Sequence, residues 1–243
     1  MNLAAAVQDR ALFGYLQWVK SGTKLSVENP IRESAILALW HEWIFVSLTT
    51  ARDPSRIAVY IWQAPGMERI IPFVRRLGFE VILAHRGNER GVNEVRQWLN
   101  DRPGRIVAIT LDGPRGPKGV AKPGVVRLAR DAGVPLRPLY LASPIAFRLP
   151  TWDGCVLPGR GEVTHRPLDV VSEQGTPEQA AKDMELALTA ASQSDIVRPD
   201  SRDAVARMWA RVSTTPLRVG RLAVLGSDAP KSPVVTGEGR LRP

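Results

Sequence analysis

A histidine with a chemically useful position follows a short apolar run. His41 comes directly after residues 36–40, ILALW, whose length and composition predict a buried strand. In α/β proteins the ends of such strands carry many reactive groups, and histidine is the usual general base near neutral pH. The sequence therefore predicts His41 as a catalytic base. The alternative is a core histidine whose ring is satisfied by a backbone carbonyl.

A second candidate is the glycine-rich loop DGPRGPKG, residues 112–119, between an expected strand and an expected helix. Glycines let the backbone approach an anion closely, and the N-terminus of a following helix adds a partial positive charge. Arg115, Lys118 and Lys122 supply cations to the same loop. We expect this loop to bind a phosphate group, although its spacing is not that of a nucleotide P-loop. The alternative is a rigid turn with solvated charges.

A third candidate is the segment AHRGNERG, residues 84–91, which also follows an expected strand. Arg86 and Arg90 in this segment could hold a second anionic group. The alternative is a pair of ordinary surface arginines in an arginine-rich chain.

The composition narrows the classes of partner and chemistry. The chain has 243 residues, one cysteine, three histidines and a net charge of +9. One cysteine excludes an internal disulfide, and the histidines lie too far apart to predict a metal site. The positive charge favours an anionic partner, which could be a nucleic acid, a membrane surface or a phosphorylated substrate. No apolar run is long enough to predict a transmembrane helix.

The elements that must position these residues alternate between strands and helices. The expected strands are residues 36–40, 57–62, 79–84, 106–111 and 135–141, and the expected helices are residues 4–20, 41–51, 66–77, 88–100, 125–132 and 178–192. This alternation predicts an α/β fold with a largely parallel central sheet flanked by helices. From residue 196 the chain is basic and proline-containing, which predicts a partly disordered tail over 196–243.

Several motifs together resemble the lysophospholipid acyltransferase-like superfamily. They are WH at 40–41, LGF at 77–79, ITLDGPRGPKGVAKPGVVRLAR at 109–130 and GVPLRPLYLASP at 133–144. Within the superfamily they are most similar to an uncharacterised bacterial branch that carries WH and DGPRGP. The resemblance covers roughly residues 10–190, and it implies a mixed sheet and an acyltransferase-like domain over 1–195.

The resemblance also implies an activity and site residues. The activity is transfer of a fatty acyl group from an acyl thioester to a hydroxyl of a lysolipid or related amphiphile. The family signature H-x-x-x-x-D begins at His41, but Val46 stands where the orienting aspartate is expected, so another carboxylate must replace it. The implied substrate-binding residues are Arg86, Asp112, Gly113, Pro114, Arg115, Gly116 and Lys118.

A thioester is already activated, so the resemblance implies neither a metal nor a redox cofactor. The expected partners are an acyl-CoA or acyl carrier protein donor, a lipid-like acceptor and an anionic membrane surface, with no nucleic acid. This implies a cytoplasmic protein that is peripheral at the inner face of the membrane. The alternative function is a catalytically weak lipid-binding or accessory protein on the same fold.

The N-terminal helix offers a possible membrane contact. It places Phe13, Leu16 and Trp18 on one apolar side, as in helices that lie in the membrane interface. The alternative is that this side packs on the core.

Overall fold

The computed structural model describes residues 3–63, 70–84, 89–169 and 174–194. Arg86 and the tail predicted over 196–243 lie outside these ranges, as do residues 85–88 of the segment 84–91. The boundary at residue 195 therefore stays a prediction.

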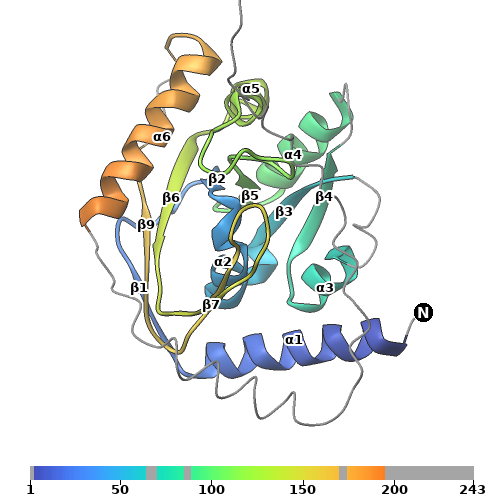
Figure 1. Cartoon of the computed structure of the whole chain (residues 1–243). Helices are drawn as coiled ribbons and strands as arrows, with labels where there is room; N and C mark the ends of the chain where they lie inside the picture. Colours follow the sequence, from blue (N-terminus) through green and yellow to red (C-terminus); the bar gives the residue numbers. More distant parts are fainter. Residues whose placement is uncertain (1–2, 64–69, 85–88, 170–173, 195–243) are drawn as a thin grey trace, which may run out of the picture. The chain divides into compact units, whose positions relative to one another are not determined.

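The described residues form a seven-stranded sheet in the order β1-β9-β6-β2-β5-β3-β4. Its strands are β1 Thr23–Val27, β2 Ala35–Leu39, β3 Ile57–Trp62, β4 Glu80–Ala84, β5 Ile106–Thr110, β6 Leu136–Ala142 and β9 Gly161–Pro167. Its neighbouring strands are parallel, with the exception of the antiparallel pair β6 and β9. The predicted α/β fold with a mixed, largely parallel sheet is thus confirmed (Figure 1).

Two groups of helices cover the two faces of this sheet. The helices are α1 Leu3–Ser21, α2 Ile44–Thr50, α3 Ile70–Arg76, α4 Glu89–Asp101, α5 Pro123–Ala132 and α6 Pro177–Ser194, with short 3-10 turns η1 His41–Trp43 and η2 Pro54–Arg56. Apolar residues of α4, α5 and α6 share a buried cluster with Ile36 and Ala38 of β2. The alternate residues Leu37 and Leu39 pack on the other face, with α2. This split follows from the two-residue period of a strand.

A small second sheet lies outside the main one. It pairs β7 Ile145–Arg148 with β8 Val156–Pro158 in antiparallel fashion. Strands β7 and β8 were not predicted from the sequence, and neither were β1 and β9. Their polar residues and short lengths give too weak a period to distinguish them from loops.

The N-terminal helix divides its apolar residues between core and surface. Leu16 and Val19 are fully buried, so Leu16 packs on the core and cannot contact a membrane. Trp18 is 50% exposed, and the guanidinium of Arg160 lies 5.0 Å from the centre of its indole ring. The prediction that this side of the helix contacts a membrane is therefore wrong for Leu16, and for Trp18 it stays a prediction.

Candidate active site

His41 stands where β2 leaves the sheet. Trp40 is still extended, with φ −70° and ψ 143°, and the chain then turns into η1 at His41. The backbone N–H of His41 donates to Oδ1 of Asp112 at 2.9 Å. Since β5, which precedes Asp112, is the parallel neighbour of β2, two adjacent strand ends fix the backbone of the histidine.

The ring of His41 is oriented by a carboxylate from a distant part of the chain. Its Nδ1 lies 2.6 Å from Oδ2 of Asp153, in the loop between β7 and β8. The carboxylate is an acceptor only, so Nδ1 carries the hydrogen and Nε2 is left as a hydrogen-bond acceptor. His41 is 27% exposed and Asp153 is 2% exposed. This arrangement excludes the alternative of a histidine satisfied by a backbone carbonyl.

Asp153 is kept ionised by its own partners. Burial alone would raise its pKa, but hydrogen bonds from Thr151 and His41, with the positive charge that His41 can carry, hold the pKa below its usual value. The Thr151 hydroxyl donates to Oδ1 at 2.5 Å, and the Cys155 N–H donates to the same oxygen at 3.3 Å. Backbone bonds between Leu149 and Cys155 and between Thr151 and Gly154 close the loop.

The carboxylate that reaches His41 does not come from position 46, where the resemblance places an aspartate. Val46, at that position, is fully buried in the apolar core. Sequence reasoning missed Asp153 because it lies 112 residues from His41, with no fixed spacing to mark it. The only available signal was a lone acidic residue in the turn-forming run 151–154, TWDG.

The structure brings the start of the glycine-rich loop next to the histidine. Asp112 is fully buried, and its two oxygens accept the backbone N–H groups of His41 and Gly119. Burial raises the pKa of Asp112, and these hydrogen bonds partly offset that effect. A role for Asp112 in substrate binding stays a prediction, since both of its oxygens already hold backbone groups of the protein.

Gly116 makes room for an aromatic wall beside the histidine. It has φ +63°, and a Cβ there would lie 2.6 Å from Cζ3 of Trp152. The Trp152 ring in turn lies with its centre 5.3 Å from that of the His41 ring. A side chain at position 116 would therefore displace the ring that covers one side of the base.

Cations gather around Glu42, the neighbour of the histidine. Oε2 of Glu42 lies 2.8 Å from Nζ of Lys118 and 2.7 Å from a terminal guanidinium nitrogen of Arg148. Arg115 is exposed and forms no ion pair with any described residue. Glu42 thus neutralises one of the two positive charges that it contacts, and the carboxylate that contacts the His41 ring is that of Asp153.

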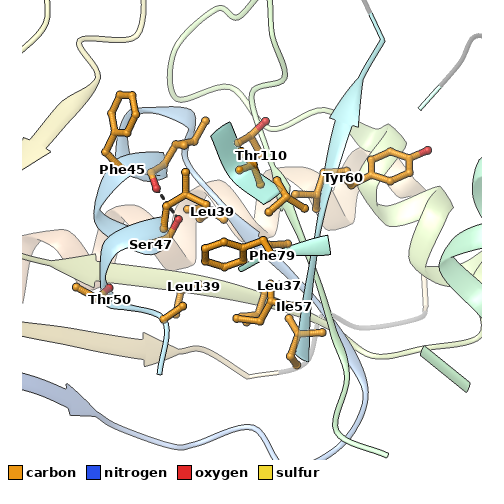
Figure 2. A pocket seen from close by; sticks show the side chains of 18 of the residues that line it. Leu37, Leu39, Phe45, Ser47, Thr50, Ile57, Tyr60, Phe79, Thr110 and Leu139 are labelled. Carbon is orange, nitrogen blue, oxygen red and sulfur yellow. Dashed lines mark hydrogen bonds between the residues drawn. The ribbon is translucent and has the colours of Figure 1, made fainter. Parts of the chain in front are cut away.

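An apolar pocket of about 900 Å³ runs along one face of the sheet (Figure 2). His41 is among the residues that line it. At the carboxyl ends of the strands it is lined by His41, Thr110, Pro114 and Trp152. Toward their amino ends it is lined by apolar side chains, which include Leu37, Val59, Phe79, Ile57 and Ile106. A five-residue strand such as β5 rises about 13 Å between its first and last residues. The pocket therefore has the shape and polarity to hold an extended hydrocarbon chain.

A second histidine lines the other part of the pocket. Nε2 of His165 lies 2.6 Å from the hydroxyl of Thr50, at the C-terminal end of α2. Burial first, and then the charge of Arg52, lower the pKa of His165 to about 4. His165 is therefore neutral near pH 7.

The described residues offer no clustered metal ligands and no membrane-spanning helix. No group of three or more His, Cys, Asp or Glu side chains within them is placed to bind a metal ion. None of their helices combines the length and hydropathy needed to cross a bilayer.

Comparison with known proteins gives few relatives. No protein-family model matches the chain. The uncharacterised protein RP090 of Rickettsia prowazekii (strain Madrid E) is 26% identical over 129 residues, which are 52% of this chain and 58% of that protein. The aligned part thus spans less than two thirds of that relative. The crystal structure of PlsC, the 1-acyl-sn-glycerophosphate acyltransferase of Thermotoga maritima, superposes with a TM-score of 0.49 at 15% identity, covering 79% of this chain and 83% of that one.

Proposed function

We propose that this protein is an acyltransferase that moves a fatty acyl group from an acyl thioester to a hydroxyl of a lysolipid or related amphiphile. The observation that carries the proposal is the hydrogen bond between His41 and Asp153 at the head of a large apolar pocket. A base with a fixed tautomer beside a hydrocarbon-shaped cavity suits acyl transfer to a hydroxyl.

The proposed reaction uses His41 as general base and then as general acid. Nε2 accepts the proton of the acceptor hydroxyl as its oxygen attacks the thioester carbonyl carbon. The tetrahedral intermediate then collapses, the carbon–sulfur bond breaks, and the proton on Nε2 passes to the leaving thiolate. Asp153 stabilises the imidazolium between these steps. General acid–base catalysis of this kind contributes about 10²–10⁴-fold.

The pocket would hold the acyl chain of the donor. Burial of each methylene group contributes about 0.8 kcal/mol, so an apolar pocket along the sheet favours long chains over short ones. The chain would lie between α2 and the sheet, with its carbonyl carbon next to His41.

The cations around Glu42 would bind the phosphate of the acceptor or of the donor. Lys118 and Arg148 hold Glu42, the neighbour of His41, and Arg115 is exposed in the same glycine-rich loop as Lys118. Arg86 is proposed for a second anionic group on the strength of the family resemblance alone. Acyl-CoA and acyl carrier protein remain the proposed donors, and an anionic membrane at the cytoplasmic face remains the proposed location of the acceptor.

The test is acyl transfer by the purified full chain from labelled acyl-CoA and acyl carrier protein to a panel of lysolipids. We expect transfer by the wild type and none by His41→Ala. Asp131→Ala, at an exposed position of α5 outside the pocket lining, is the control and should keep most of the activity. Full activity in His41→Ala with intact thermal unfolding would refute the assigned base. Fatty-acid binding without transfer to any acceptor would favour the lipid-binding alternative.

A further inference from the structure

The hydroxyl of Thr110 lies in the wall of the pocket. The hydroxyls of Ser47 and Thr50 donate to backbone carbonyls of α2 or its flank, and that of Thr151 donates to Asp153. The Thr110 hydroxyl, by contrast, has no hydrogen bond with any residue that the structure describes. Thr110 is half-buried, so its hydroxyl can donate to a ligand that enters the pocket.

Thr110 lies on the same face of the sheet as the base. It is the last residue of β5, and its Cα is the register partner of Leu39 in β2. The next residue continues this pairing, because the Leu111 N–H donates to the Leu39 carbonyl at 2.9 Å. Partners in adjacent strands point to the same side, and Figure 2 shows both Leu39 and Thr110 among the pocket side chains. Tyr60 also lines the pocket but packs against the cluster on the opposite face.

The position of Thr110 relative to His41 defines what its hydroxyl can reach. Leu39 precedes His41 by two residues, so Thr110 lies deeper along the direction in which the pocket runs. His41 contacts the acceptor hydroxyl in the proposed reaction, while the acyl chain continues into the pocket. The carbonyl group of the donor would therefore lie between His41 and the part of the pocket that holds the acyl chain.

We infer that the Thr110 hydroxyl donates a hydrogen bond to the carbonyl oxygen of the bound thioester and stabilises the negative charge that this oxygen acquires. No proton is transferred in this interaction, because His41 accepts the proton of the acceptor. The inference rests on the proposed acyl transfer, and it adds a catalytic residue that contacts the reacting group. A donor aimed at a developing oxyanion acts mainly on the transition state.

Two substitutions separate the hydroxyl from the shape of the side chain. Thr110→Val keeps the β-branched form that suits a strand and removes only the donor, whereas Thr110→Ser keeps the donor. We expect Thr110→Val to lower kcat by about 10- to 100-fold, with the KM for acyl donor within twofold of the wild type. Thr110→Ser should recover most of the kcat. Equal melting temperatures would show that all three proteins are folded.

A binding measurement tests the same hydroxyl without turnover. An alkylphosphonate with a chain matched to the best donor presents tetrahedral anionic oxygens, like those of the intermediate. Calorimetric titration should show at least tenfold weaker binding to Thr110→Val than to the wild type and to Thr110→Ser. Equal binding to all three proteins, or an equal loss in both variants, would overturn the inference. If the wild type binds the phosphonate at least tenfold more tightly than Thr110→Val does, but transfers no acyl group, only the proposed function is contradicted.

Discussion

Replacement of Asp153 by asparagine removes one charge from the site and almost no volume. The carboxylate is buried and accepts Nδ1–H of His41 at 2.6 Å. Asparagine can still accept a hydrogen bond, but it can no longer stabilise an imidazolium by charge. A hydrogen bond to a charged group contributes about 1.5–3 kcal/mol. At about 1.4 kcal/mol per tenfold change in rate, we expect kcat to fall by roughly 10- to 150-fold.

The assay is release of free thiol from acyl-CoA in the presence of saturating acceptor. KM for the donor should change little, because Asp153 contacts His41 and the loop of Thr151 rather than the pocket's apolar wall. Asp131→Asn, at an exposed carboxylate on α5, is the matched control and should match the wild type. Unchanged kcat in Asp153→Asn, with an unchanged melting temperature, would refute the assignment of Asp153 as the orienting group.

Three further predictions follow from the charges, the pocket and the buried histidine. Arg115→Ala should raise the KM for the phosphorylated substrate about tenfold or more with little change in kcat, since a charge-assisted contact contributes about 1.5–3 kcal/mol. If the KM values of the variant for donor and acceptor both equal those of the wild type, Arg115 is not part of the binding site. Leu37→Trp should fill the deeper part of the pocket and disfavour long acyl chains. If three methylene groups of the chain no longer fit, kcat/KM for the long-chain donor falls by roughly 50-fold, at about 0.8 kcal/mol for each methylene. An unchanged preference for chain length would show that the acyl chain binds elsewhere. The folded-state pKa of His165 is depressed to about 4, so its neutral form contributes stability above the unfolded pKa of about 6.5. That stability is lost as the pH falls toward 4, by about 2 kcal/mol at pH 5. The melting temperature of His165→Gln should therefore fall less than that of the wild type between pH 7 and pH 5, and parallel curves would contradict this.

The parts of the fold that could be predicted from the sequence are those with strong local signals. Continuous apolar runs such as 57–62 and 106–111 mark buried parallel strands, and the structure has β3 and β5 there within a residue. The helix expected over 125–132 ends at Ala132 in the structure, and Gly133 follows it at φ +69°, as is common at helix C-termini. His41 and the loop 112–119 could be placed together because both follow strands of one parallel sheet.

The parts that could not be predicted depend on contacts between distant segments. Asp153 reaches His41 only because β7 and β8 fold back over the end of β2, and no periodicity encodes that return. The same is true of Arg148, whose partner Glu42 is 106 residues away. Thr110 looked like an ordinary strand residue, and only its register with Leu39 identifies it as part of the pocket wall.

The hairpin of β7 and β8 carries several residues that contact Glu42 and His41, so a change in this one segment can alter several of these contacts at once. Arg148 holds Glu42, and the loop that follows carries Trp152 against the ring of His41 and Asp153 on its Nδ1. Residues 145–158 thus supply a cation near Glu42, an aromatic ring beside His41 and a carboxylate on its Nδ1. His41 itself follows strand β2 of the main sheet. A graft of residues 145–158 onto another sheet of this kind would transfer the contacts to Glu42 and to the His41 ring together, whereas exchange of a single residue would change one contact at a time.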